Sequence, residues 1–294
     1  MSSIHRNRED WLIDIFCAAA ALLIIFVTVY PIFYCLIYSL NDGRDAVLGG
    51  IYLLPRQFTW ENYRFIFRDP SIYWSFLITL IRTALGTLLG VFFTAMVAYG
   101  LSRKYLMFRK TYLAIGIITI YFGGGLIPTY LLYRQLQLID TIWVYIIPPM
   151  FSFFNALLFV AFFSELPDAL EESAKIEGAD DFTIFTRIFL PLATPITATI
   201  ALFIGVWHWN DWFFPAFYIT NEKLMTLPAI LMRVMSLAQA QQELSRIATA
   251  YQTPITMQSI RYATLVVAIL PITLIYPFLQ RYFIKGMLIG AIKE

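Results

Sequence analysis

Six long apolar runs dominate the pattern of hydrophobic and polar positions along the chain. The hydrocarbon core of a bilayer is crossed by about 20 consecutive apolar residues in a helix, and each run reaches that length. Polar or charged segments separate the runs, which cover about residues 12–38, 72–100, 112–133, 142–163, 192–219 and 262–283. The pattern therefore predicts an all-α membrane protein with six transmembrane helices in one transmembrane domain over residues 1–294.

The composition agrees with this fold class. Of the 294 residues, 60% are hydrophobic and only 14% are charged, and the mean hydropathy is +0.69. Soluble domains carry about 25% charged residues, so a soluble enzyme, a disordered protein and a secreted disulfide scaffold are excluded. The net charge of +2 is too small to indicate a nucleic-acid partner. Cys17 and Cys35 lie in one apolar run, about 27 Å apart along a helix, and cannot form a disulfide with each other.

The first apolar run is expected to remain in the mature protein as a span. It is too long for the apolar region of a signal peptide. Asp14 and the bulky residues around Cys17 fit neither a small-residue cleavage site nor a lipid-attachment motif.

Basic residues in the short connecting segments indicate the orientation. An even number of spans places both termini on one side of the membrane. The connection after the third run holds only Arg134, whereas the segment 102–111 holds Arg103, Lys104, Arg109 and Lys110. Because short cytoplasmic loops carry an excess of Lys and Arg, we expect both termini in the cytoplasm. The segments 39–71 and 220–261 are then long and external, and a helix from Pro228 to about Ala250 is expected to lie along the outer surface or to contact a partner.

Sequence motifs for catalysis or cofactor binding are absent. The chain has no phosphate-binding G-x-x-x-x-G-K-[ST] loop, no H-E-x-x-H metal motif and no G-x-S-x-G nucleophile turn. His5 and His208 are the only histidines, which excludes a histidine-rich metal site. We therefore expect no catalytic residue, metal or cofactor in this chain. Gly123–Gly125 open an apolar run and indicate close helix packing or a local break.

The inner segment 164–191 has the pattern of two short helices. The first begins near Pro167, with acidic residues in its first turn, and Gly178 can end it in a left-handed cap. The second is expected from about Asp180 to Phe189, with Pro191 ending it. Its aromatic face would offer an anchor to another protein, and nearby small residues would let a foreign backbone come close. That face holds Phe182, Phe185 and Phe189, and the small residues are Ser173, Ala174 and Ala179. A solvated amphipathic loop is the alternative interpretation of the same composition.

The spacing within this segment resembles a known signature. Glu172-Ser173-Ala174, then Gly178, then Ile188-Phe189-Leu190-Pro191 is similar to the "E-A-A, three residues, G, nine residues, I-x-L-P" pattern of permease subunits of binding-protein-dependent ABC importers. Ser173 stands where that family usually has Ala. The chain also resembles the shorter permease of the maltose-importer type, in the branch for polysaccharide or lipoprotein-type uptake. The stretches that carry this likeness are 79–83 with Gly86, 122–130, 209–212 and 285–293.

The resemblance implies a set of partners and roles. A permease of this type works with a second homologous permease, two cytoplasmic ATPase subunits that hold ATP and Mg²⁺, and an external solute-binding protein, in the inner membrane of a bacterium. Its inner segment docks into a cleft of the ATPase. In this chain the resemblance assigns that coupling role to Glu171, Glu172, Ser173, Ala174, Gly178, Ala179, Ile188, Leu190 and Pro191. Glu172 would pair with a basic group of the ATPase, and Gly178 would form the bend between the two short helices. The tail residues Lys285, Gly286 and Gly290 would also reach the ATPase.

Polar residues inside the spans are candidates for the translocation path, because such groups are costly in a bilayer. Arg82 lies about ten residues into the second run. One interpretation is that it snorkels outward or pairs within the membrane domain, and the other is that it faces the path and attracts an anionic substrate. A second cluster supplies the rings, amides and carboxylates that bind sugars: Trp207, His208, Trp209, Asn210, Asp211 and Trp212. Alternatively, this cluster is an aromatic interface belt whose polar members bond neighbouring helices.

Together these features predict the transmembrane subunit of an ATP-driven carbohydrate importer that works by alternating access. The branch resemblance favours an oligosaccharide, and Arg82 and His208 favour an acidic one such as an alginate- or pectin-like uronate oligomer. A neutral sugar is the alternative substrate. The alternative class is a secondary transporter driven by an ion gradient, which would need paired intramembrane carboxylates or a broken-helix ion site. Asp211 is the only carboxylate that lies well inside a late predicted span, so no such pair is evident there. An intramembrane hydrolase is a more distant alternative.

Overall fold

The computed structural model describes residues 8–245, 256, 258–271, 273–274 and 277. These residues are almost entirely helical, and their one isolated β-bridge joins Asn41 and Phe58. The chain divides into two compact units, Met1–Asp69 with Arg233–Ile269, and Pro70–Met232 with Leu270–Glu294. Each unit is described by itself.

The first unit contains the long helix α1 (Arg8–Ser39), the short helices α2 (Gly43–Val47) and α3 (Glu61–Arg68), and helical residues 258–269. Most of α1 is exposed and apolar on all sides, as expected for a helix surrounded by lipid. Its last turns pack through Ile37 and Tyr38, and the Tyr38 ring lies 5.1 Å from that of Tyr262. Asn62 of α3 donates hydrogen bonds to the Ser39 and Asn41 carbonyls, which ties α3 to the end of α1.

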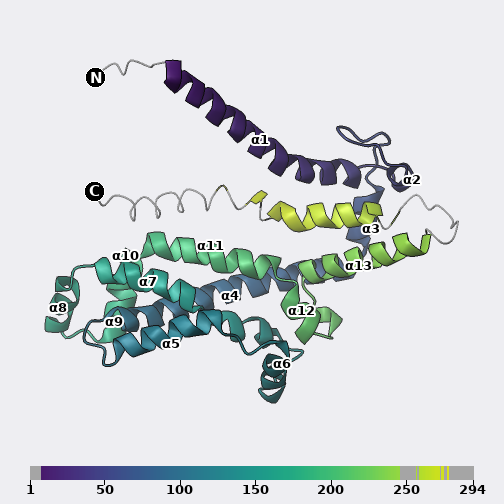
Figure 1. Cartoon of the computed structure of the whole chain (residues 1–294). Helices are drawn as coiled ribbons and strands as arrows, with labels where there is room; N and C mark the ends of the chain where they lie inside the picture. Colours follow the sequence, from purple (N-terminus) through teal and green to yellow (C-terminus); the bar gives the residue numbers. More distant parts are fainter. Residues whose placement is uncertain (1–7, 246–255, 257, 272, 275–276, 278–294) are drawn as a thin grey trace. The chain divides into compact units, whose positions relative to one another are not determined.

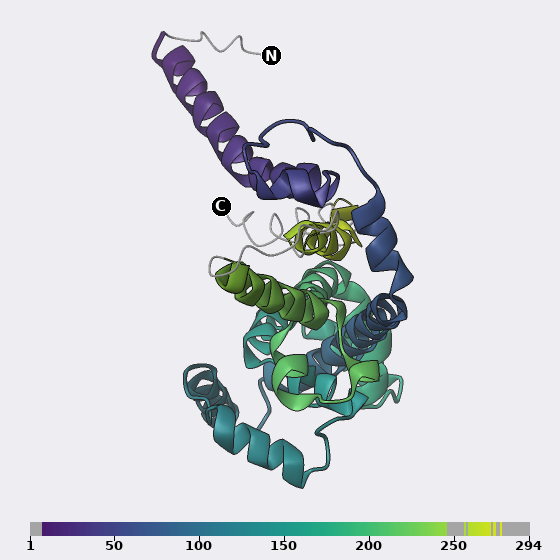
Figure 2. The ribbon, with the colours of Figure 1, turned by 90° about the vertical axis from the view of Figure 1, so that its right-hand side faces the viewer.

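The second unit is built on the long helix α4 (Pro70–Ser102), which packs against α7 (Phe153–Glu165) and α11 (Thr194–Asn210). The helix α5 (Arg109–Tyr121) packs against α7 (Figures 1 and 2). Glycines permit these close approaches. A Cβ at Gly86 would overlap the His208 ring of α11, and one at Gly116 of α5 would overlap the Phe153 ring of α7.

The apolar runs form two long helices and three bent pairs among the described residues. Trp11–Ser39 and Pro70–Ser102 are each long and apolar enough to cross a membrane. The bent pairs are α5 with α6 (Leu126–Gln135) at 113°, residues Ile142–Met150 with α7 at 46°, and Asp181–Leu192 with α11 at 86°. Residues Ile142–Met150 contain the 3₁₀ turns η1 (Ile142–Tyr145) and η2 (Pro148–Met150). Up to five spans result if each pair counts as one. The predicted sixth run, 262–283, lies only partly within the described residues.

Besides the run 142–163, which is the bent pair of Ile142–Met150 with α7, two predicted runs differ from single straight helices. In the run 112–133 the chain breaks between Tyr121 and Leu126, and Gly125 has φ +80°, a conformation that favours glycine. Of the two interpretations of this glycine segment, the structure has the local break. The run 192–219 is interrupted at Asp211, whose carboxylate accepts hydrogen bonds from the amides that start α12 (Phe213–Tyr218).

The predicted outer helix begins as expected. The helix α13 spans Leu227–Ser245 after the short 3₁₀ turn η4 (Glu222–Leu224). Its predicted end near Ala250 lies outside the described residues.

Candidate functional site

The inner segment folds around the helix α8 (Ala169–Ile176). Its end is a Schellman motif, in which the Gly178 amide donates to the Lys175 carbonyl at 3.0 Å and the Ala179 amide donates to the Ala174 carbonyl at 3.0 Å. Gly178 has φ +84°, and a Cβ there would meet no other atom within 4 Å. Glycine is therefore favoured here by backbone conformation rather than by space, and the predicted left-handed cap is confirmed.

The second part of the segment differs from its prediction. Asp180 caps α9 (Asp181–Ile184) by accepting the Thr183 amide at 3.2 Å. Hydrogen bonding to the Thr183 side chain, and then to its amide, lowers the pKa of Asp180. The chain continues through the π-helical turn η3 (Phe185–Phe189) and α10 (Leu190–Leu192). Pro191 thus does not end the helix at Phe189, and that prediction was wrong. The π turn changes the hydrogen-bond register just before Pro191, which has no N–H to donate.

Two of the three aromatic residues predicted as an anchor face the protein's own core. Phe185 and Phe189 are buried, and their ring centroids lie 5.6 and 5.0 Å from that of Tyr99. Phe163 of α7 adds a ring 5.9 Å from Phe189. Only Phe182 is exposed, so the predicted aromatic docking strip is reduced to this residue. Burial in the core stabilises the segment's position against α4 and α7.

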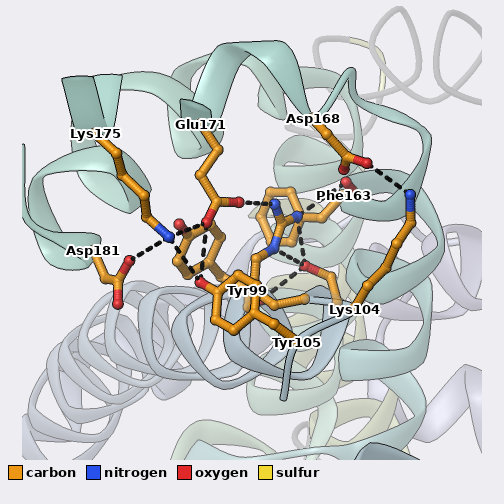
Figure 3. A network of polar contacts seen from close by, with 10 residues as sticks. Tyr99, Lys104, Tyr105, Phe163, Asp168, Glu171, Lys175 and Asp181 are labelled. Carbon is orange, nitrogen blue, oxygen red and sulfur yellow. Dashed lines mark hydrogen bonds and ion pairs between the residues drawn. The ribbon is translucent and has the colours of Figure 1, made fainter. Parts of the chain in front are cut away.

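A buried carboxylate fixes α8 to the rest of the unit (Figure 3). Glu171 is 6% exposed and accepts hydrogen bonds from Arg103 Nη1 at 2.6 Å, Lys175 Nζ at 2.6 Å and the Tyr105 hydroxyl at 3.0 Å. Burial by itself raises the pKa of Glu171, but these three donors outweigh it and hold the pKa below its ordinary value. The hydrogen bond to Glu171 raises the pKa of Lys175. Glu171 was predicted as a coupling residue, and the structure gives it partners within its own chain.

Arg103 was used in the sequence analysis only to predict the orientation and was not predicted as a site residue. Its Nε and Nη2 donate to Ser102 Oγ at 3.0 and 2.8 Å, and Nη2 also donates to the Phe163 carbonyl at 3.3 Å. Its guanidinium lies 4.5 Å from the centroid of the Phe189 ring. Arg103 therefore joins the end of α4, the end of α7, α8 and η3. The signal in the sequence that could have indicated Arg103 is its charge: it is a basic residue directly after a predicted span, on the same predicted side of the membrane as the acidic segment 164–191.

The remaining coupling residues divide by exposure. Glu172, Ser173, Gly178 and Pro191 are exposed, Ala179, Ile188 and Leu190 are half-buried, and Ala174 is buried. Ile176, which was not predicted as a site residue, is 87% exposed. The outward side of α8 is thus available to a partner protein, while its inward side carries Glu171 and Ala174. The tail residues Lys285, Gly286 and Gly290 lie outside the described residues.

In the interior, Arg82 is paired rather than free. Its side chain is fully buried, its Nη2 forms an ion pair with the Asp211 carboxylate, and its Nη1 donates to the Asp211 carbonyl at 3.2 Å. The guanidinium carbon lies 4.5 Å from the centroid of the Tyr145 ring and 5.7 Å from that of Trp207. Of the two interpretations of Arg82, the structure has the pairing within the membrane domain.

The rest of the Trp207–Trp212 cluster is split between the core and the surface. His208 is 1% exposed, packs against Gly86, and has no hydrogen-bond partner for either ring nitrogen within the described part of the chain. Trp209 is buried, with its ring 6.0 Å from that of Phe76. The more exposed members are Trp207, Asn210 and Trp212. No group of three or more His, Cys, Asp or Glu residues able to hold a metal occurs among the residues searched, which are those described.

Comparison with known proteins identifies the family. A family model described as "binding-protein-dependent transport system inner membrane component" matches residues 70–289. The chain belongs to this family. It is therefore the non-catalytic permease subunit of an ABC importer, located in a bacterial inner membrane, and it works with an ATPase and a substrate-binding protein.

Individual relatives of the permease match over nearly its whole length. It is 34% identical to the polygalacturonan/rhamnogalacturonan transport system permease protein YtcP of Bacillus subtilis (strain 168), covering 98% of this chain and 99% of the relative. It is 36% identical to the protein LplC of the same strain, covering 91% and 90%. A solved bacterial ABC transporter involved in the import of the acidic polysaccharide alginate contains a chain with a TM-score of 0.84 and 26% identity, covering 96% of this permease and 100% of that chain.

These findings confirm the resemblance and the all-α permease fold, and the count of six spans stays a prediction. The permease's matched region begins at the first residue of α4 and includes the whole inner segment, so the buried Arg103–Glu171 and Arg82–Asp211 pairs both lie within it. Membership in an ATP-driven importer family also removes the ion-gradient transporter as an alternative.

Proposed function

We propose that this permease imports acidic oligosaccharides derived from uronate-containing polysaccharides. The similarity to YtcP over almost the full length of both chains carries the proposal, because that relative's name specifies polygalacturonan and rhamnogalacturonan. The structural neighbour belongs to an importer of alginate, which is likewise acidic. Galacturonate and alginate oligomers share one chemistry, a pyranose ring with a carboxylate on each acidic unit.

Arg82 does not contribute a free cation to this proposal. Asp211 neutralises it, and its side chain is fully buried. Selection of the acidic groups therefore rests on other groups of this permease or on the partner proteins, whereas Trp207, Asn210 and Trp212 are candidates for contacts with the sugar ring. Aromatic rings bind the apolar faces of sugars, and exposed members of this cluster could supply such contacts.

The proposed assembly follows the predicted one. The permease pairs with a second homologous permease in the lipid bilayer, and both of its termini lie in the cytoplasm. Two ATPase subunits, which hold ATP and Mg²⁺, receive the exposed side of α8 with Glu172, Ser173 and Ile176, while Lys285, Gly286 and Gly290 of the tail also contact them. The segment 220–261 faces the solute-binding protein. This chain itself holds no cofactor and breaks no bond.

In the proposed cycle, ATP binding brings the ATPase subunits together and displaces α8. The displacement rearranges the helices so that the path opens outward to receive the sugar, and ATP hydrolysis resets it. Nucleotide or solute favours one of the two states only to the extent that it binds that state more tightly than the other state.

Transport into proteoliposomes tests the substrate class. The complete importer, with its binding protein, is supplied with an oligogalacturonate or with the methyl ester of the same oligomer, which keeps the ring and length but removes the charge. We expect ATP-dependent uptake of the acid and little uptake of the ester. Equal or preferential uptake of the ester would establish a neutral-sugar importer, and uptake of the acid without ATP would contradict the assignment altogether.

A further inference from the structure

The helix α4 joins two polar clusters, each built around a buried ion pair, that lie at different levels of the second unit. The first, here called the Arg103 clamp, consists of Ser102, Arg103 and Glu171. The second, here called the Arg82 clamp, consists of Trp74, Thr79 and Arg82 on α4 and the groups they hold in the segment 211–227. Neither cluster takes part in catalytic chemistry. Both bury charge in the interior of the membrane protein, which costs free energy, so we expect each to have a function.

The Arg103 clamp ties the end of α4 to the ATPase-facing helix. The side chains of Arg103 and Glu171 are 6% and 8% exposed, and they are joined at 2.6 Å. Arg103 also holds the carbonyl of Phe163 at the end of α7 and stacks over Phe189. A displacement of α8 therefore acts directly on the end of α4.

The Arg82 clamp ties α4 to the opposite side of the unit. Arg82 holds Asp211, the Thr79 hydroxyl accepts the Leu227 amide at 2.9 Å, and the Trp74 indole donates to the Lys223 carbonyl at 2.5 Å. Both ends of the segment 211–227, and Lys223 four residues before its second end, are thus attached to one helix.

The segment 211–227 is also held by residues that precede α7 in the chain. Asp140 accepts hydrogen bonds from the Thr220 amide at 2.9 Å, the Thr220 hydroxyl at 3.0 Å and the Asn221 amide at 2.7 Å. The Tyr145 hydroxyl donates to the Leu224 carbonyl at 2.8 Å. These bonds attach the middle of the segment to the residues before α7, so its two ends are held by α4 and its middle by Asp140 and Tyr145.

Other routes between the two sides contain bends. The residues Asp181–Leu192 meet α11 at 86°, α5 meets α6 at 113°, and the residues before α7 meet it at 46°. By contrast, α4 runs for 33 residues from Pro70 to Ser102 with no proline after its first position, a length of about 50 Å at 1.5 Å per residue. Within the described part of the second unit, α4 is the one unbroken long helix.

We propose that α4 transmits the displacement of α8 to the segment 211–227, with Arg103 and Arg82 as the positioning residues at the two attachments. The segment 211–227 then follows the nucleotide state of the ATPase. This inference rests on the proposed docking of α8 to the ATPase and does not depend on which sugar is carried. Breaking either clamp leaves the ATPase able to bind and hydrolyse ATP but disconnects the far segment from it.

The test uses a cysteine reporter on the far segment in the complete importer. Cys17 and Cys35 are replaced by Ser, and the exposed residue Ala216 of α12 is replaced by Cys. The rate of labelling by a membrane-impermeant maleimide is measured without nucleotide and in the ATP-vanadate-trapped state, beside ATP hydrolysis and co-purification of the ATPase. We expect nucleotide to change the labelling rate in the otherwise unaltered chain.

Paired neutral substitutions disconnect each clamp without stranding a buried charge. These are Arg103→Gln with Glu171→Gln, and Arg82→Gln with Asp211→Asn. Both are expected to lose the nucleotide-dependent difference in labelling while the ATPase still co-purifies and hydrolyses ATP. Lys104→Gln is the matched control, because it removes the exposed ion pair between Lys104 and Asp168 in the same region and should leave the difference intact.

A milder variant covers the case in which a paired substitution prevents assembly. Trp74→Phe with Thr79→Val removes two hydrogen bonds of the Arg82 clamp, keeps both charges, and should reduce the nucleotide-dependent difference. The proposal is overturned if this variant and the assembled paired variants respond like the control. It is equally overturned if nucleotide leaves the labelling of Ala216→Cys unchanged in the unaltered chain. An acidic sugar that fails to be transported would contradict the proposed substrate and leave these labelling results unaffected.

Discussion

The ion pair between Arg82 and Asp211 provides the sharpest test of the interior. The two side chains are 0% and 6% exposed, so the small contributions of surface ion pairs do not apply to them. Asp211→Asn removes one charge and keeps the ability to cap α12, because Asn and Asp are equally good at that position. What remains is a buried guanidinium with no counter-charge.

The expected magnitude follows from that burial. Removing one partner of a buried pair destabilises a protein by about 3–5 kcal/mol, which for a domain of 150–250 residues lowers the midpoint of thermal unfolding by roughly 6–20 °C. Removing both charges, with Arg82→Gln added, should recover most of this loss, because no charge is then left unpaired. The rings of Tyr145 and Trp207 lie within 6 Å of the guanidinium and offset only part of the penalty.

Thermal unfolding of the purified permease complex in detergent, followed by the loss of its monodisperse peak on size-exclusion chromatography, measures the effect. Lys104→Gln serves as the control, since its ion pair is exposed on both sides. The reasoning is refuted if Asp211→Asn unfolds at the same temperature as the control, or if the double variant is less stable than Asp211→Asn alone.

Four further predictions concern the inner segment and the helix packing. Gly86→Ala adds a Cβ that overlaps His208, so it should destabilise the α4–α11 contact by about 1–3 kcal/mol, measured as a lower unfolding temperature; an unchanged temperature would contradict the packing. Gly178→Val places a branched residue at φ +84°, which costs about 1–3 kcal/mol, so ATP hydrolysis should become uncoupled from uptake while membrane insertion persists; normal uptake would count against the assigned bend. Glu172→Lys should lose the ATPase on co-purification without losing the second permease, and retention of the ATPase would exclude this contact. Because the pKa of Glu171 lies below its ordinary value of 4.5, its stabilisation of α8 should be complete above that pH and disappear as the pH falls through the lower folded-state pKa; hydrogen exchange of α8 should show this acid loosening, and Glu171→Gln should abolish the pH dependence.

Local signals in the sequence were enough for part of the architecture. Gly178 follows a run with acidic residues at its start, and a glycine at that position predicts a left-handed cap whatever lies around it. The apolar run 72–100 likewise predicted the helix α4, which spans Pro70–Ser102. Such features depend on residues within a few positions of one another, so the pattern contains the information needed.

Long-range partners were not predictable in the same way. Arg82 and Asp211 are 129 positions apart, and nothing along the chain says that these two side chains meet rather than face a water-filled path. The same limit explains the error over Phe185 and Phe189. Their spacing established that they share a face, but only the arrival of Tyr99 from another helix decides that this face is covered.

The adjacent carboxylates Glu171 and Glu172 show how one helix serves two surfaces. Successive residues on an α-helix point about 100° apart, so these two side chains cannot face the same neighbour. Glu171 faces inward with Ala174, and its position four residues before Lys175 gave the one sequence signal of an internal partner. Glu172 is exposed, on the side where Ile176 also projects. Under the proposed docking, α8 needs its inner carboxylate to be held within the chain, because a docking helix that moved independently of Arg103 would absorb the displacement of the ATPase instead of passing it to α4. The stretch that resembles the E-A-A signature contains the outer carboxylate Glu172, and Glu171 just before it is the residue that joins α8 to Arg103.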